Sequence, residues 1–161
     1  TTPSPANPLV IINAGTTRTR GLELALTGKI TKAWQISGGY TWQDAYIKGN
    51  DAIRVAQVPR HQFALWNRYD FSRTVGAGLG VVHQASQYAA LHNPAGNNFA
   101  TRLPGFTRVD AALFLSPCEK VQLQVNIENL LDETYYSDAH NNNNISTGAP
   151  INARFTARVK F

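Results

Sequence analysis

The sequence predicts an all-β protein, an antiparallel transmembrane β-barrel segment of about eight strands. Three observations predict it: apolar and polar residues alternate in long runs, the connections between these runs alternate in length, and aromatic residues gather near the run ends. The closing run at residues 151–161 shows the alternation most clearly. Its apolar face suits lipid, and its other face suits a polar interior because it carries three cations. These are Arg154, Arg158 and Lys160.

The expected strands follow from a period of two along the chain. They lie at residues 9–12, 22–27, 34–47, 60–71, 75–88, 106–115, 121–128 and 151–161. Trp66 and Asn67 interrupt the alternation of the fourth strand. Glycines occupy one face of the fifth strand, where they would weaken a soluble sheet. In a barrel we expect them to leave room for bulky neighbours or a ligand inside.

The connections between the expected strands alternate strictly between short and long. Short turns are expected at residues 28–32, 72–74 and 116–119, and long polar loops at residues 48–58, 89–103 and 137–150. One rim of the sheet would therefore carry tight turns and the other extended loops, as in outer-membrane barrels. A soluble β-sandwich, the alternative fold, has no reason to sort its loops in this way. Residues 14–20 are expected to form a polar turn and residues 129–136 a helical turn.

Aromatic residues lie near the ends of the expected strands. At the short-turn rim they are Trp34, Tyr69, Phe71 and Phe161, and towards the long-loop rim they are Trp42, Tyr46, Tyr88 and Phe106. Such girdles are expected where lipid meets water. The strand lengths also approach the roughly 9–11 residues that a tilted transmembrane strand requires.

Composition disfavours several other classes of protein. A chain of 161 residues is expected to form one domain, and its 16% of charged residues is low for a soluble protein. No apolar run approaches the roughly 18 residues of a membrane helix. The net charge is +5, but the cations are spread over many segments instead of forming one nucleic-acid-binding surface. The chain lacks Met and begins at Thr1, so we expect a carboxy-terminal piece of something longer.

Four sequence motifs occur in a fixed order. They are Arg20-Gly21-Leu22-Glu23-Leu24, Val58-Pro59-Arg60-His61, Leu103-Pro104-Gly105-Phe106-Thr107-Arg108-Val109-Asp110 and Val125-Asn126-Ile127-Glu128-Asn129-Leu130-Leu131-Asp132. With the terminal Phe161, they resemble the carboxy-terminal part of TonB-dependent outer-membrane receptors. Residues 140–145, followed by Gly148-Ala149-Pro150, resemble the catecholate-siderophore branch of that family.

The resemblance implies a large barrel whose lumen is filled by an amino-terminal plug domain that contacts TonB. Residues 1–161 would be the carboxy-terminal β-barrel region, with the plug absent from this chain. The implied function is uptake of a ferric siderophore, of the catecholate type, across the bacterial outer membrane, energised through TonB. The siderophore is the transported ligand, and no covalently bound cofactor is expected. The implied partners are the lipid bilayer, lipopolysaccharide, the plug and remaining barrel strands, TonB through the plug, and the outer-membrane assembly machinery, with no nucleic acid.

The long loops are expected to form the extracellular mouth and to contact the ligand. The candidate ligand-binding residues are Tyr88, His92, Arg102, His140 and Asn142. The histidines are isolated and a siderophore already satisfies its iron, so no metal-ligating residue is expected. Residues 141–144 have an alternative interpretation as a polar loop tip, because Asn readily adopts turn conformations.

Other polar and terminal residues are expected to have roles in folding. Residues 126–133 are interpreted as a strand end and a capped turn, in preference to a carboxylate or cation site. The inward cations are expected to pair with inward acids; the cations are Arg108, Arg154, Arg158 and Lys160, and the acids are Glu23, Asp110 and Glu128. The resemblance supports an assembly signal for outer-membrane insertion at Phe155, Val159 and Phe161.

Two architectures and two functions remain open at this point. The strands could form an arc of a larger barrel, or they could close on themselves, because eight strands suffice for a small barrel. The first function is that of a transporter segment. The alternative is a small standalone outer-membrane barrel with a structural or assembly role and no transport. No enzyme activity is expected, because no nucleophile, base and orienting group converge in any motif.

Overall fold

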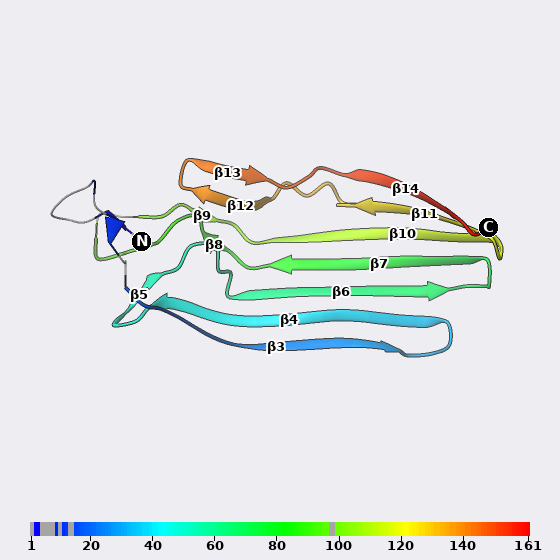
Figure 1. Cartoon of the computed structure of the whole chain (residues 1–161), viewed down its shortest axis with the longest axis horizontal. Coiled ribbons are helices and arrows are strands. Elements are labelled where there is room, and N and C mark those ends of the chain that lie inside the picture. Colours follow the sequence, from blue (N-terminus) through cyan, green and yellow to red (C-terminus); the bar gives the residue numbers. More distant parts are fainter. Residues whose placement is uncertain (1, 4–8, 10, 13–14, 97–98) are drawn as a thin grey trace.

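Antiparallel pairing joins the long strands into one sheet in the computed structural model, which describes residues 2–3, 9, 11–12, 15–96 and 99–161. The strand order is β14-β11-β10-β7-β6-β4-β3, with the short β5 beside β4 (Figure 1). The bounds are β3 Thr17–Lys29, β4 Trp34–Ile47, β5 Asn50–Arg54, β6 His61–Asp70, β7 Val75–Gln84, β10 Phe106–Cys118, β11 Val121–Glu128 and β14 Asn152–Val159. The eight strands confirm the predicted all-β antiparallel class.

Among the described residues, three two-stranded sheets lie outside the main sheet. β8 (Gln87–Tyr88) pairs with β9 (Arg102–Leu103), and β12 (Tyr136–Asn141) pairs with β13 (Asn144–Thr147). The third joins β1 (Thr2–Pro3) to β2 (Ile11–Ile12). The strand expected at residues 9–12 lies only partly within the described residues, and its described part in β2 is not a member of the main sheet. All three small sheets lie at the end of the molecule opposite the tight turns (Figure 1).

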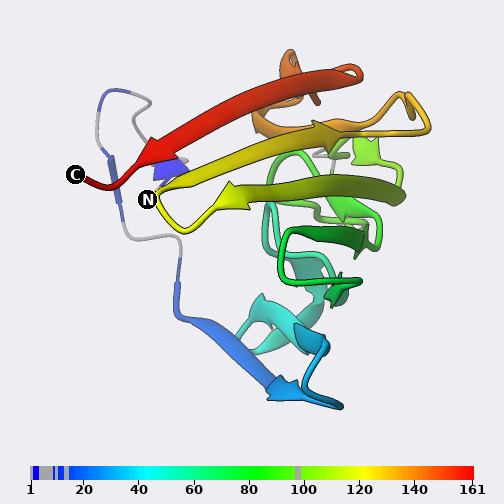
Figure 2. The ribbon, with the colours of Figure 1, turned by 90° about the vertical axis from the view of Figure 1, so that its right-hand side faces the viewer.

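The main sheet is open. β3 and β14 are its outer strands, and no pairing joins them to each other within the described residues. Figure 2 shows the sheet curving from β14 at one edge to β3 at the other. Of the two architectures that the sequence allowed, this part of the chain adopts the arc and not the small closed barrel.

The register places most apolar residues of the long strands on one face. Leu22 pairs with Trp42 and Leu24 pairs with Tyr40, and β14 continues the same face with Phe155. Leu24 is 57% exposed and Phe155 is 77% exposed, as expected for side chains that face lipid. The opposite face carries the polar residues and is the inward face of the wall. Among the described residues, no helix is long and apolar enough to cross a membrane.

The glycines of β7 explain why β6 departs from simple alternation. Trp66 lies on the inward face, and a Cβ atom at Gly80 would lie 2.5 Å from its Cε3 atom. The guanidinium of Arg68 also crosses β7, and lies 4.1 Å from the ring centroid of Phe114 on β10. Contact between strands that are not neighbours shows that the polar face is the concave one. The prediction that these glycines make room for bulky neighbours is confirmed.

At residues 66 and 67 of β6 the usual facing is reversed: the apolar Trp66 is inward and the polar Asn67 is outward. The Oδ1 atom of Asn67 accepts a hydrogen bond of 3.3 Å from Nε1 of Trp34. A polar side chain on an apolar face requires such a partner, because an unpaired amide in lipid is unfavourable. The interruption at Trp66 and Asn67 is therefore a local exchange of faces within a continuous strand.

Two sequence predictions about local structure are wrong. The polar turn expected at residues 14–20 ends early, because β3 begins at Thr17 and pairs with Ile47. Strand residues beyond the lipid need no apolar face, so alternation cannot reveal them. Residues 129–136 form no helical turn; instead Asn129 and Asp132 adopt left-handed backbone angles, with φ of 56° and 50°.

The aromatic girdles are confirmed at one rim and only partly at the other. Trp34, Tyr69 and Phe71 are exposed near the short turns, and Trp42 is exposed near the long loops. The other three aromatic residues predicted for the long-loop girdle do not face lipid. Tyr46 is buried, Tyr88 belongs to the loop strand β8, and Phe106 lies inward with its ring 4.3 Å from that of Tyr135.

Candidate ligand-binding site

The three long loops pack against one another at their rim of the sheet. Ala89, Leu103 and Ala139 form a buried cluster, and Ile145 packs against it. Residues of this cluster come from the loop that contains β8 and β9 and from the β12–β13 hairpin. We call this assembly the loop layer, formed by residues 48–60, 85–96, 99–105 and 129–151. The loop layer positions side chains more firmly than separate flexible loops would.

Hydrogen bonds between loops fix the relative positions of their tips. Asn142 accepts a hydrogen bond of 2.8 Å from the backbone N–H of Thr101. The side chain of Gln57 accepts one of 3.4 Å from the N–H of Ala139. The backbones of Arg54 and His92 also bond to each other in both directions. All three loops are therefore connected directly.

A cavity of about 430 Å³ lies between the end of β4 and these loops. Its charged lining consists of one carboxylate, Asp44, and three guanidiniums, those of Arg54, Arg60 and Arg102. The lining therefore has two positive charges in excess, and Tyr88 and Ser86 add no charge to it. Such a lining attracts an anionic ligand.

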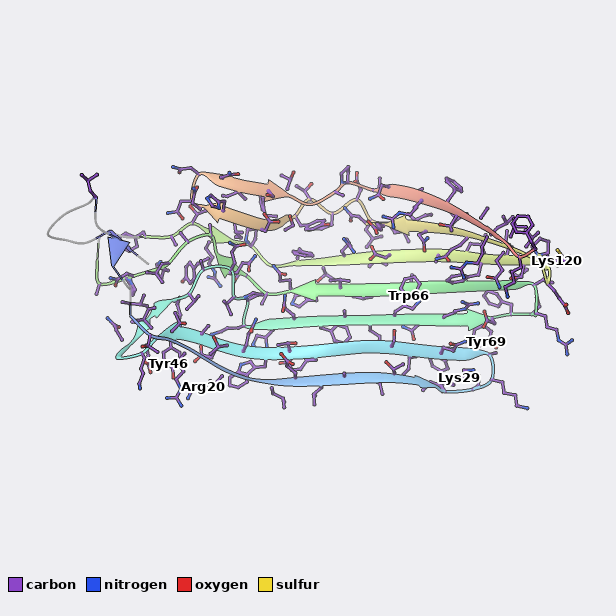
Figure 3. All side chains as sticks on the ribbon, in the orientation of Figure 1. Arg20, Lys29, Tyr46, Trp66, Tyr69 and Lys120 are labelled. Carbon is purple, nitrogen blue, oxygen red and sulfur yellow. The ribbon has the colours of Figure 1, made fainter. Side chains whose placement is uncertain are left out.

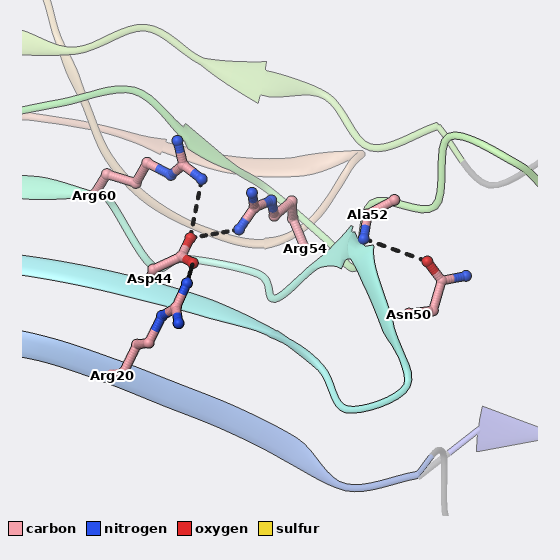
Figure 4. Close-up of polar contacts among 6 residues, drawn as sticks. All are labelled: Arg20, Asp44, Asn50, Ala52, Arg54 and Arg60. Atoms are coloured by element: carbon pink, nitrogen blue, oxygen red, sulfur yellow. Dashed lines mark hydrogen bonds and ion pairs between the residues drawn. The ribbon is translucent and has the colours of Figure 1, made fainter.

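Asp44 lies at the centre of a charge cluster on the cavity wall (Figure 4). Its Oδ1 atom accepts hydrogen bonds of 2.6 Å from Nη1 of Arg54 and 3.0 Å from Nη2 of Arg60. Its Oδ2 atom lies 3.5 Å from Nη2 of Arg20. Asp44 lies two residues past the girdle residue Trp42 on β4, which continues to Ile47 and places Asp44 at the long-loop end of the strand. β5 returns Arg54 towards it.

The ionisation of Asp44 is set by two opposing effects. Burial acts to raise the pKa of this carboxyl, but the hydrogen bonds and charges of Arg54 and Arg60 outweigh burial and hold the pKa below its ordinary value. Asp44 is only 8% exposed, so its negative charge is directed at the arginines and not at solvent. The cluster keeps both arginines in place on the cavity wall.

Arg102 and a pair of stacked rings supply the remaining chemistry. The Nε and Nη2 atoms of Arg102 donate hydrogen bonds of 3.0 and 2.7 Å to Oγ of Ser86, and no ion pair in the described part of the chain neutralises it. The rings of Tyr88 and His92 stack with centroids 4.1 Å apart and planes 3° apart. A flat aromatic surface beside guanidiniums suits a ligand that is both aromatic and anionic.

The structure brings together only some of the residues predicted for the ligand site. Tyr88 and Arg102 line the cavity, and His92 stacks on Tyr88. Asn142 connects two loops, which gives it a structural contact. His140 is exposed on β12 and does not line this cavity.

Sequence reasoning missed Asp44, Arg54 and Arg60. Asp44 is in phase with Tyr40 and Trp42 on β4, so a charged residue interrupts the apolar row at this position. That interruption was the available sequence signal. Arg54 ends β5, and Arg60 lies in the connection before β6. Their convergence depends on the pairing of β5 with β4, so it had no local signal in the sequence.

The motif at residues 126–133 has the predicted structural role. Asn129 is almost fully buried, and its Nδ2 atom donates to the carbonyls of Glu133 and Ala149 at 2.9 and 3.1 Å. Its Oδ1 atom accepts from the N–H of Glu133, and its own N–H donates to Asp110. Asp132 accepts from the N–H of Ile151. This motif therefore joins the ends of β10 and β11 to the start of β14.

The predicted inward ion pairs are only partly present. Arg108 pairs with Asp110 at 2.9 Å, as expected. In the described part of the chain no ion pair involves Glu23 or Glu128, nor the three cations of the closing strand, so those pairings are wrong. No group of three or more potential metal-ligating side chains occurs among the described residues. The residues of the predicted assembly signal, Phe155, Val159 and Phe161, are all exposed.

Comparison with known proteins identifies relatives of one kind. Residues 1–130 match the family model for the TonB dependent receptor-like β-barrel. The catecholate siderophore receptor Fiu of Escherichia coli (strain K12) is 31% identical over 158 residues, which cover 91% of this chain and 20% of that receptor. The metal-pseudopaline receptor CntO of Pseudomonas aeruginosa (strain UCBPP-PA14) is 28% identical over 169 residues, which cover 99% of this chain and 23% of that receptor.

Solved structures show the same fold. The crystal structure of the siderophore receptor PiuA from Acinetobacter baumannii matches with a TM-score of 0.79 and 25% identity, covering 90% of this chain and 22% of PiuA. This chain therefore spans about a fifth of the length of the relatives it matches.

Proposed function

The chain belongs to the β-barrel family of TonB-dependent receptors of the outer membrane, and on that premise we propose that it is the carboxy-terminal barrel wall and mouth of a ferric siderophore receptor. The complete protein would bind the chelate at the long-loop rim and carry it across the outer membrane. Energy would come through TonB, which would contact the plug domain. Binding and conformational change suffice for this task, with no covalent chemistry.

The cationic cavity is the observation that supports this function. Iron-bound catecholates present aromatic rings and negatively charged oxygens. The guanidiniums of Arg54, Arg60 and Arg102 would donate hydrogen bonds to the negative oxygens, and the Tyr88–His92 stack would lie against a ring. The relatives differ in ligand by name, so the catecholate class rests on this pairing of charge and aromatic surface.

Arg102 gives the clearest test, because its hydrogen bonds within the protein go to Ser86 and not to a carboxylate. In the full-length receptor, R102Q should weaken binding of a ferric catecholate about tenfold, since one charge-assisted hydrogen bond contributes about 1.5 kcal/mol or more. Quenching of intrinsic fluorescence would measure the affinity. R18Q, on β3 outside the cavity, is the matched control and should bind normally. Equal affinity of R102Q and R18Q would contradict the proposal.

The closing strand is proposed to carry the assembly signal as well. Phe155 and Val159 project from the lipid-facing side of β14, and Phe161 follows. Removal of Phe161 should reduce the amount of heat-modifiable folded receptor in outer-membrane fractions, because the insertion machinery would read this end. An unchanged amount would refute that role while leaving ligand binding untouched.

The alternative of a small standalone barrel receives no support from the described residues. An eight-stranded barrel requires its first and last strands to pair. β3 and β14 are instead the two outer strands of an open sheet. We therefore propose that the remaining barrel strands and the plug are the partners that complete the wall, together with lipid and lipopolysaccharide around it.

A further inference from the structure

Two adjoining hollows lie on the inward face near the short turns. Their volumes are about 370 and 170 Å³, and they share Arg68, Phe114 and Ser116. The first extends towards Lys32 and Arg73 in the turns, and the second extends to Arg158 on β14. We call the two hollows together the basic groove. It lies at the opposite end of the wall from the ligand cavity; Figure 3 marks the short-turn end with Lys29, Tyr69 and Lys120.

The charges of the basic groove are poorly balanced. Four cations line it, Lys32, Arg68, Arg73 and Arg158, against one carboxylate, that of Asp70. Asp70 is already engaged, because its Oδ1 atom accepts a hydrogen bond of 3.0 Å from Nε of Arg68. Within the described residues Lys32, Arg73 and Arg158 form no ion pair. Three positive charges are therefore in excess.

The position of the groove restricts what could neutralise these charges. The groove is on the polar, concave face, whereas the lipid-facing leucines are on the other face, so a phospholipid headgroup does not reach it. From β6 to β14 the groove crosses four strand spacings, about 19 Å at roughly 4.8 Å each. That length suits an extended segment of roughly six residues and exceeds a single small anion.

A domain that fills the lumen would bury the excess cations of the basic groove, so they would need counter-charges. A body packed against this wall removes water from the groove, and a buried cation without a counter-charge is strongly unfavourable. We propose that the basic groove docks an acidic segment of the domain that fills the lumen, with at least two carboxylates bound by Arg158 and by the Lys32–Arg73 side. This inference rests on the proposed receptor function, because only a complete receptor has such a domain.

Arginine favours a carboxylate partner at this site. Its planar guanidinium can donate two parallel hydrogen bonds to one carboxylate, and Arg68 is held on Phe114 with Nε donating to Asp70. The remaining nitrogens of Arg68 are available at the centre of the groove. An anionic chelate passing through the lumen would contact the same cations only transiently. A docked acidic segment would stay bound to them, so a stable contact distinguishes the segment from the chelate.

Carbodiimide cross-linking of the full-length receptor tests the proposal directly, because it joins a lysine amine to a carboxylate only when the two are in contact. Mass spectrometry would then identify the partner of Lys32. The substitution Arg158→Lys tests a second position, because it keeps the positive charge and introduces an amine that carbodiimide can couple. Lys48 at the long-loop rim is the matched control. The expected result is linkage of Lys32, and of the amine in the R158K variant, to Asp or Glu residues of the lumen-filling domain, with no such linkage at Lys48.

Linkage only to carboxylates of the wall, such as Asp70, or no linkage at either position, would overturn the proposal. Binding of a ferric catecholate should be measured on the same preparation. Linkage without binding would refute the proposed function alone, and binding without linkage would refute the groove alone.

Discussion

The barrel wall and the loop layer place their apolar residues in opposite ways. In the wall, Leu22, Leu24 and Leu26 lie on the outer surface and are at least half exposed. In the loop layer, Ala89 and Leu103 are almost fully buried and form a core with residues of the β12–β13 hairpin. The wall therefore depends on lipid to cover its apolar side chains, whereas the loop layer covers its own. The wall is surrounded by lipid, so its apolar side chains are on the outside. The loop layer is surrounded by water, so its apolar side chains are buried.

The joint between the two regions should be the most sensitive point. Asn129 is almost fully buried, and its side chain makes three hydrogen bonds to backbone groups. N129A leaves those groups unpaired and places Ala at a φ of 56°, so we expect a loss of about 4 kcal/mol. The temperature at which the folded band disappears in semi-native gels of the full-length receptor would measure it. N143A, at an exposed turn, is the control, and equal behaviour of the two variants would refute the role of the joint.

A charge on the outer face of the wall should have the next largest effect. L24R places a cation in lipid and should cost about 2–4 kcal/mol near the membrane midplane. The measurement is the fraction of folded receptor in reconstituted bilayers. E23R changes the adjacent, inward-facing residue of β3 and should fold nearly normally. If E23R is the more damaging variant, the assignment of faces is wrong.

A cavity in the loop layer should act locally. L103A removes the largest apolar side chain of the buried cluster, and we expect a loss of about 2 kcal/mol. Proteolysis of the loops should become faster while the membrane-embedded barrel stays folded. Cleavage at an unchanged rate would show that the loop layer has no core of its own, and so would remove the contrast with the wall.

The smallest effect should be a pH dependence of the loop layer. The pKa of Asp44 is lower in the folded protein than in an unfolded chain, so the unfolded state binds more protons at acid pH and stability rises with pH there. The contribution is fully present above the ordinary Asp value, about 3.9, and is lost as pH falls below it. Hydrogen exchange of residues 50–60, corrected for its intrinsic pH dependence, should therefore increase at acid pH. D44N should remove that dependence, and the same acid response in D44N would assign it to another group.

The sequence predicted the wall better than the loop layer, and the reason is physical. Alternation in β4, β10, β11 and β14 records which face meets lipid, so facing could be read directly from the residues. The loop hairpins, β5 and β12–β13, have no such record, because pairing and contacts between loops decide their positions. For the same reason the sequence led to Tyr88 and Arg102 as separate candidates but not to the Asp44 cluster, whose members lie up to 40 residues apart.

Near the short turns β7 contributes backbone to the wall but no inward side chains, because its inward positions there are Gly76, Gly78 and Gly80. Trp66 on β6 covers Gly78 and Gly80, and Arg68 reaches over β7 to Phe114 on β10. Any molecule moving along the inside of the barrel would therefore touch β6 and β10 as if they were adjacent. At this end of the wall the interior surface thus has fewer rows of side chains than the sheet has strands, and recognition inside the lumen should tolerate change on β7 only while Gly76, Gly78 and Gly80 remain glycine.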